Sequence, residues 1–212
     1  PSARREIAET LVKLEGGDPK LTSLWNKTRQ WCLDEFEQYY ELMGVSFDQY
    51  FFESEFEKPG KVLVNGLLER GIAQKSEGAI IVDLKDAGLD VFIVLKSDGA
   101  ALYATKDLAL AKHKFEEFGI ERSVHVVGSE QKLYFRQLFK TLELMGFANA
   151  KNCFHLAYEL VTLPEGKMSS RMGNVITFRG VFEEAKEKAA DEVRKRHQDW
   201  DEERIQSTSR AI

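Results

Sequence analysis

The chain has 212 residues, 43% of them hydrophobic and 31% charged, and its formal net charge at pH 7 is −5. This length and composition suffice for one large domain or two small ones with a core. The acidic balance argues against a stand-alone nucleic-acid-binding module, because such modules bind mainly by neutralising phosphates, so any RNA contact must be local. No apolar run approaches the roughly 18 residues of a membrane-spanning helix, and residues 1–5 lack the apolar stretch of a secretory signal. We therefore expect a soluble, cytoplasmic protein.

The two cysteines lie far apart, Cys32 on an apolar helix face and Cys153 in an apolar strand. Neither has a second Cys or His at the spacing of metal ligands, so we expect buried reduced thiols and no protein-bound metal. The only compact basic cluster is Arg194-Lys195-Arg196-His197. A solvated helix face explains that cluster at least as well as RNA binding does.

The first third of the chain reads as helical. Asp18-Pro19 is a favourable helix start, with a capping residue followed by proline at the first helical position, and Gly44 can end the helix. Between them, large side chains recur every three or four residues, which predicts a face packed into a core. The residues of this face are Leu21, Leu24, Trp25, Thr28, Trp31, Cys32, Phe36, Tyr39, Tyr40 and Met43.

The next segments favour a short helix and a small sheet. After the break Lys58-Pro59-Gly60, the sequence predicts a helix over about 61–70, ended by Gly71. Two extended apolar runs follow, residues 79–84 and 91–95, joined by Asp86-Ala87-Gly88, and they resemble a hairpin.

From Ala100 onward the rhythm changes to strands alternating with helices, which predicts parallel βαβ units. The expected order is strand 100–103, helix 105–118, strand 123–127, helix 130–145 and strand 154–163, with a long charged helix over about 181–198 afterwards. Ligands of such sheets bind at the carboxyl ends of strands. The residues just after Leu102, Val127 and Leu163 are therefore the candidates for a site.

The junction after Leu163 is a loop rich in small and cationic residues, running from Pro164 to Asn174. Lysine, arginine, two serine hydroxyls and exposed backbone N–H groups suit a polyphosphate, because all of them can reach its oxygens. A solvated cationic hairpin accounts for the same composition.

The junction after Leu102 reads Tyr103-Ala104-Thr105-Lys106-Asp107. Thr105 can cap a helix, and Asp107 can gain from the helix dipole in the first turn. Alternatively, Asp107 and Tyr103 face the sheet crevice, where a carboxylate would match the planar donor fork of a guanidinium. At the junction after Val127, Gly128 permits a tight turn and close approach of a ligand, and Ser129 is a plausible cap. Most turns of this kind bind nothing.

Three segments carry a family resemblance: residues 167–171, residues 103–107 and residues 126–131. Lys167-Met168-Ser169-Ser170-Arg171 resembles the Lys-Met-Ser-Lys loop of class I aminoacyl-tRNA synthetases in the form common among arginyl-tRNA synthetases, and Tyr103-x-Thr105-x-Asp107 resembles their Tyr-x-Thr-x-Asp motif. The resemblance implies that Tyr103, Asp107 and Gln131 bind arginine. It also implies that Gly128 lies beneath the adenosine and that Lys167, Met168, Ser169, Ser170 and Arg171 bind ATP. Catalysis would fall to Lys167, Ser169, Ser170 and Arg171, which stabilise the pyrophosphate leaving group.

Other phrases, such as Leu14-Glu15-Gly16-Gly17-Asp18-Pro19, resemble the connective insert of the same family. The resemblance implies an α/β fold, a parallel Rossmann-like half-sheet with βαβ units, preceded by a mainly helical insert and followed by a helical stem segment. The expected domains are the helical and small-sheet connective insert (1–95), the second half of the nucleotide-binding fold (96–178) and the start of the stem (179–212).

The resemblance implies ATP with Mg²⁺ as substrate, together with L-arginine and tRNA(Arg), and we expect a monomer without membrane contact. None of the four histidines lies in the family's His-x-Gly-His signature, and Ser170 stands where the general signature has a second lysine. We therefore expect an inactive fragment of the catalytic domain. A non-catalytic binding or assembly module remains an alternative. Another class I specificity, such as cysteine, would need zinc ligands that two isolated cysteines do not supply.

Overall fold

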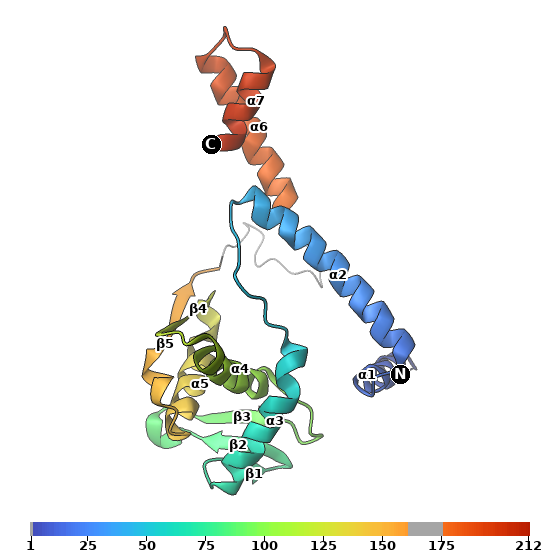
Figure 1. Ribbon diagram of the computed structural model, residues 1–212, viewed down its shortest axis with the longest axis vertical. Helices are drawn as coiled ribbons and strands as arrows, with labels where there is room; N and C mark the ends of the chain where they lie inside the picture. The colour runs from blue at the N-terminus through green and yellow to red at the C-terminus, as the bar shows by residue number, and fades with distance from the viewer. Residues whose placement is uncertain (1, 161–175) are drawn as a thin grey trace. The chain divides into compact units, whose positions relative to one another are not determined.

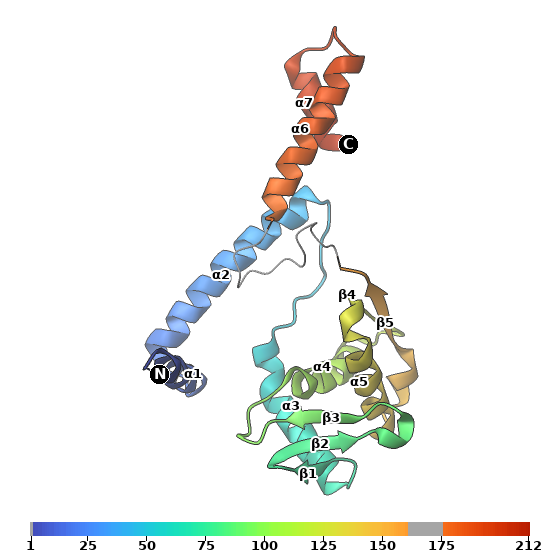
Figure 2. The same cartoon turned by 180° about the vertical axis from the view of Figure 1, so that it is seen from behind.

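The computed structural model describes residues 2–160 and 176–212 and divides into two compact units, 1–58 and 59–212. Its helices and strands are shown from two sides in Figures 1 and 2. The predicted domain boundaries at residues 95 and 178 follow the family resemblance and stay a prediction.

The first unit is built mainly from α1 (Ser2–Glu15) and α2 (Pro19–Leu42). The predicted start of α2 is confirmed, because Asp18 Oδ1 accepts hydrogen bonds from Lys20 N and Leu21 N, both at 3.0 Å. The predicted core face is wrong, because α2 has no buried residue and Cys32 is exposed. The guanidinium of Arg29 instead lies over the Trp25 and Phe52 rings, 4.6 and 4.7 Å from their centroids.

Helix α3 (Glu53–Glu69) begins earlier than the sequence predicts and continues through Pro59. Proline and glycine are both unfavourable inside a helix, which is why Pro59-Gly60 read as a break. The described structure gives a packing reason for the glycine, since Gly60 is buried against Thr105.

A three-stranded antiparallel sheet follows, formed by β1 (Gln74–Ser76), β2 (Ala79–Asp83) and β3 (Val91–Leu95) in that order. The predicted hairpin of β2 and β3 is confirmed, with Asp83 opposite Val91. Its turn contains η1 (Lys85–Ala87) and ends at Gly88, whose φ of 66° favours glycine. Strand β1 was not predicted, because its three residues are all polar and exposed.

The second sheet is a parallel pair, β4 (Ser123–Gly128) and β5 (Cys153–Tyr158), connected through η2 (Ser129–Gln131), α5 (Lys132–Leu144) and η3 (Ala148–Asn152). This is one of the predicted βαβ units, and the chain is a mixed α/β protein with mostly helical structure. The predicted strand over 100–103 is wrong. Only Ala101 forms an isolated antiparallel bridge, to Leu95, and α4 (Tyr103–Phe118) already begins at Tyr103.

One core joins α3, the three-stranded sheet, α4 and α5, and both views in Figures 1 and 2 show these helices against the strands. Its fully buried aliphatic side chains include Val64, Leu67, Val82, Val94, Leu108, Leu138 and Leu142. One amide enters this core: Gln137 on α5 donates through Nε2 to Leu89 O (2.7 Å) and Val91 O (3.3 Å). Cys153 is buried as a free thiol, as expected.

The charged C-terminal segment forms α6 (Phe178–Arg196) and α7 (Glu202–Ala211), which pack through Ala190, Val193 and Ile205. Thr177 caps α6 by accepting from Gly180 N, and Asp201 caps α7 by accepting from Arg204 N. The predicted helix over 181–198 is therefore confirmed with shifted ends. Across residues 2–160 and 176–212, no helix is long and apolar enough to cross a membrane.

Candidate functional site

A pocket of about 290 Å³ collects the predicted arginine-binding residues. They come from two places in the sequence: Tyr103 and Asp107 from α4, and Gln131 from the turn after β4. The remaining lining side chains are Val127, Tyr134 and Phe135. The structure thus brings together two of the three junctions that the sequence singled out.

Tyr103 and Asp107 are four residues apart on α4 and so share one helix face. The tyrosine side chain is 68% exposed, whereas Asp107 is half-buried. Because the helix begins at Tyr103 rather than Thr105, Asp107 lies in the second turn and gains less from the helix dipole than the sequence suggested. Stabilisation by the helix dipole therefore explains the carboxylate of Asp107 less well than a role in the pocket does.

Tyr134 is a pocket residue that the sequence analysis missed. Its hydroxyl donates to Asp107 Oδ2 at 2.5 Å, across 27 residues of sequence. The ring is held edge-on by Phe92 and Phe135, with centroids 5.7 and 5.3 Å away. Only its spacing of three residues from Gln131, on the next turn, could have indicated it.

The turn after β4 differs in detail from expectation. Gly128 has φ −55° and ψ 149°, a conformation open to any residue, so the turn itself does not require glycine. Ser129 does not cap a helix; its hydroxyl donates to Glu159 Oε2 at 2.7 Å. Lys132 Nζ lies 3.7 Å from the other oxygen of Glu159. These contacts connect the residues that follow β4 with the residue that follows β5.

The third predicted constellation, Lys167 to Arg171, lies outside the described residues. The last described residue before it, Leu160, lies beside the β4 end: a methyl group added to Gly128 would be 3.6 Å from Leu160 Cδ2. In the parallel register, Gly128 is also opposite Tyr158. Residues 158–160 therefore lie at the carboxyl end of the β4–β5 pair, as Gly128 does.

The side chains of the pocket suit a ligand that has a cationic group and an apolar stem. Asp107 supplies a carboxylate, and Gln131 and Tyr103 supply further polar groups at the rim. Val127 and Phe135 supply apolar wall, against which aliphatic carbons can be buried. A carboxylate beside apolar walls binds a guanidinium more strongly than one in open water, because the local dielectric is lower.

A second polar cluster lies under the opposite end of β4. Lys114 Nζ donates to Ser123 Oγ at 2.9 Å, and that oxygen lies 3.2 Å from His125 Nε2. Burial, and then the neighbouring charges of Lys114 and His155, lower the pKa of His125 to about 4. Burial likewise lowers the pKa of Lys114 and raises that of the Cys153 thiol. Since Ser123 is the first residue of β4, this cluster is at the strand end away from the pocket.

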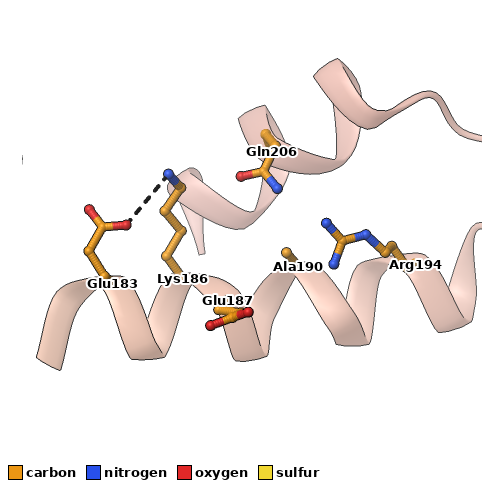
Figure 3. A pocket seen from close by; sticks show the side chains of 6 residues that line it. All are labelled: Glu183, Lys186, Glu187, Ala190, Arg194 and Gln206. Atoms are coloured by element: carbon orange, nitrogen blue, oxygen red, sulfur yellow. Dashed lines mark ion pairs between the residues drawn. The ribbon is translucent and has the colours of Figure 1, made fainter. Parts of the chain in front are cut away.

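Figure 3 shows a polar pocket of about 250 Å³ between α6 and α7. Its cations have carboxylate partners: Lys186 lies 3.9 Å from Glu183, and Arg194 binds Asp191 at 2.9 Å and Glu202 at 2.5 Å. The basic cluster around Arg194 is therefore largely an ion-pair network along a solvated helix, as one of the two explanations predicted.

Among residues 2–160 and 176–212, no three His, Cys, Asp or Glu side chains are grouped so that they could hold a metal ion.

Comparison with known proteins identifies the family to which this chain belongs. The model of the class I tRNA synthetase (R) catalytic domain matches residues 3–212. The arginine–tRNA ligase of Bdellovibrio bacteriovorus is 43% identical over 204 residues, covering 96% of this chain and 35% of the relative. That of Clostridium beijerinckii is 38% identical over 197 residues, covering 93% of this chain and 35% of the relative.

Solved structures give the same fold. Arginyl-tRNA synthetase from Plasmodium falciparum superposes with a TM-score of 0.79 at 17% identity, over 100% of this chain and 35% of that one. The Thermus thermophilus enzyme superposes with a TM-score of 0.67 at 21% identity, over 98% of this chain and 43% of that one. The chain belongs to the class I arginyl-tRNA synthetase family, within its catalytic domain. It spans 35% of the length of each of these two curated relatives.

Proposed function

We propose that this chain is the arginine-recognising part of an ATP-dependent arginine–tRNA ligase. In the proposed reaction a carboxylate oxygen of arginine attacks the α-phosphorus of ATP, and pyrophosphate leaves as arginyl-adenylate forms. A ribose hydroxyl of the terminal adenosine of tRNA(Arg) then attacks the arginyl carbonyl and AMP leaves. The observation that carries the proposal is the pocket that joins Tyr103, Asp107 and Gln131.

Asp107 is the proposed partner of the substrate guanidinium, because a carboxylate can accept from its donor fork. Tyr134 supports this role by donating to one carboxylate oxygen, which fixes the orientation of the group. Tyr103 lies on the same face of α4 and Gln131 lies across the pocket, so both can contact the rest of the amino acid.

The nucleotide is proposed to lie at the adjoining end of β4, with Gly128 beneath the adenosine. Lys167 to Arg171 would stabilise the charge that grows on the pyrophosphate as it leaves. Mg²⁺ would accompany ATP and neutralise phosphate charge. The family and the position of Leu160 beside Gly128 support this placement.

The domain scheme remains part of this proposal: a connective insert over 1–95, the second half of a Rossmann-like nucleotide fold over 96–178 and the start of a helical stem over 179–212. The parallel β4–β5 pair supports the middle assignment. A cytoplasmic monomer is proposed from the family alone.

The test is Asp107→Asn in the full-length gene product that contains this sequence. Arginine-dependent ATP–pyrophosphate exchange, with tRNA present, should show kcat/KM for arginine lowered roughly 10- to 100-fold. That corresponds to the ~1.5–3 kcal/mol of a hydrogen bond to a charged group. The KM for ATP should stay within about twofold, because the variant removes only a guanidinium contact.

Glu117→Gln is the matched control, since it removes an exposed carboxylate from the same helix, more than two turns from the pocket. It should leave both substrates unaffected. Unchanged arginine kinetics in Asp107→Asn would remove this residue from the site and, with it, the proposed recognition mode.

The chain of 212 residues alone should give no turnover in the same assay. The family's His-x-Gly-His signature is not in its sequence, so part of the proposed catalytic machinery has no counterpart here. Aminoacylation by these residues alone would refute the proposal that they form an incomplete unit.

A further inference from the structure

A close helix contact lies behind the pocket, between α3 and the first turn of α4. Gly60 on α3 is buried, and a methyl group placed on it would lie 2.2 Å from the carbonyl oxygen of Thr105 and 2.8 Å from its carbonyl carbon. Carbon and oxygen atoms cannot approach that closely without bonding. Only glycine lets α3 lie against the α4 backbone at this point.

Thr105 on α4 is also held by two hydrogen bonds of its side chain. The Thr105 hydroxyl donates to Val94 O on β3 and accepts from Leu102 N at 2.9 Å. Thr105 has no solvent exposure, so neither partner could be replaced by water without rearrangement. The first turn of α4 is thus fixed against α3, against β3 and against its own N-cap.

Thr105 is two residues after Tyr103 and two before Asp107, the two α4 side chains that line the pocket. Adjacent turns of a helix move together, because backbone hydrogen bonds link each residue to the residue four positions further on. Any displacement of the Thr105 carbonyl is therefore passed to both pocket residues. Their binding geometry depends on a residue of α3 that does not line the pocket.

The composition of α3 also indicates that Gly60 is required for packing. Pro59-Gly60 places the two least favourable helix residues side by side in the interior of a 17-residue helix. Gly66 on the same helix has no atom within 4 Å of a methyl group added to it. Gly60 is the one of these two glycines whose lack of a side chain is used for packing.

We infer that Gly60 and Thr105 are positioning residues for arginine recognition: they hold the first turn of α4 so that Tyr103 and Asp107 meet the substrate in register. The inference rests on the proposed function of the pocket. It assigns no contact with arginine to either residue, and it predicts a defect confined to the amino acid substrate.

The experiment is Gly60→Ala in the full-length gene product. The added methyl must displace the Thr105 carbonyl by about 1 Å to reach a normal contact distance. Errors of this size in a binding site cost up to about 100-fold, so the KM for arginine should rise at least tenfold. The KM for ATP should stay within about twofold, and circular dichroism should show an unchanged helix content.

Gly66→Ala is the matched control: the same substitution on the same helix, where the methyl has open space. It should leave the KM for arginine unchanged and raise the melting temperature slightly, because alanine favours helix more than glycine does. A folded Gly60→Ala protein with the arginine KM of the parent would overturn the inference.

A second pair of variants decides the question if Gly60→Ala does not fold. Thr105→Val keeps the β-branched shape but removes the hydroxyl bonds to Val94 and Leu102, and it should raise the KM for arginine selectively. Thr105→Ser keeps the hydroxyl and should restore most of the arginine affinity. Equal arginine KM values for the valine and serine variants would also overturn the inference.

The Asp107→Asn result separates this inference from the proposed function. If Asp107→Asn impairs arginine use and Gly60→Ala does not, the pocket stands and only the positioning role fails. If Asp107→Asn has no effect on arginine, the pocket assignment itself fails.

Discussion

Helices α2 and α5 both carry apolar side chains at helical spacing, but only α5 is packed. Five residues of α5 are buried, whereas α2, almost twice as long, has none. On α5 one face contacts the core while its N-terminal turns border the pocket. On α2 the side chains of the apolar face are at most half-buried within the described residues, and Trp31 is 59% exposed. Periodicity therefore predicts a helix and its apolar face, but not what covers that face.

The largest expected difference between the two helices is in stability. Leu138 on α5 has no exposure, so Leu138→Ala should lower the free energy of unfolding by about 3 kcal/mol through lost burial and the cavity left behind. Trp31→Ala on α2 should change it by less than about 0.5 kcal/mol in the 212-residue chain. Urea denaturation measures both. Similar losses would mean that the apolar face of α2 is covered after all.

The environment of α5 should also give stability a pH dependence through His125, whose ring lies 5.0 Å from Phe135 and 5.5 Å from Phe139. Its folded-state pKa of about 4 lies below the ordinary value near 6.5, so the unfolded chain binds a proton first as pH falls. The contribution of His125 to the free energy of unfolding is fully present above pH ~6.5 and is lost progressively as the pH falls toward ~4. Since the imidazole is only partly buried, we expect ~1–2 kcal/mol.

Urea denaturation at pH 7.5 and pH 5 measures this effect, and NMR titration of the imidazole measures the pKa directly. His125→Phe keeps an aromatic ring beside Phe135 but cannot titrate, so it should lose this part of the pH dependence. A His125 resonance that titrates near 6.5 would contradict the explanation.

A third difference concerns the function of the first turn of α5, which borders the pocket. Tyr134→Phe keeps the ring packing but removes the hydrogen bond to Asp107, and should raise the KM for arginine roughly 5- to 10-fold, the ~1–1.5 kcal/mol of one hydrogen bond. Steady-state aminoacylation by the full-length gene product tests it. Tyr158→Phe, an exposed tyrosine of β5, is the control. An unchanged arginine KM would show that Asp107 is oriented without Tyr134.

The smallest effect should come from α2, which depends on local interactions. Asp18→Ala removes both hydrogen bonds to the first turn and should cost about 1 kcal/mol or less of helix stability. Amide hydrogen exchange of Lys20 and Leu21 is the suitable measurement. Exchange rates there should rise while those of α5 stay constant; no change would indicate that contacts other than the cap fix the start of α2.

Much of the second unit could be predicted from sequence because local pattern and packing agree there. The β4–α5–β5 unit has apolar strands with a helix of matching length between them, and Tyr103, Asp107 and Gln131 were placed in one site by strand ends and a family motif. The error over 100–103 has a tertiary cause: Thr105 bonds to Leu102 N and Val94 O, which starts the helix two residues early.

Other features had no sequence signal. Tyr134 reaches Asp107 across 27 residues, and such a contact exists only once α4 and α5 are packed. Gly60 read as a helix breaker because the sequence does not show that Thr105 will lie against it. Strand β1 has no apolar residue, so it depends on pairing with β2 rather than on its own pattern.

The amide of Gln137 has a consequence for the outer edge of the three-stranded sheet. Strand β3 is last in the order β1-β2-β3, and an edge of this kind can recruit a foreign strand and start aggregation. Gln137 occupies the Leu89 and Val91 carbonyls, and Thr105 occupies that of Val94. Side chains from two helices thus already use two carbonyls of β3, those of Val91 and Val94, so a foreign strand that paired with this edge would find fewer acceptors there.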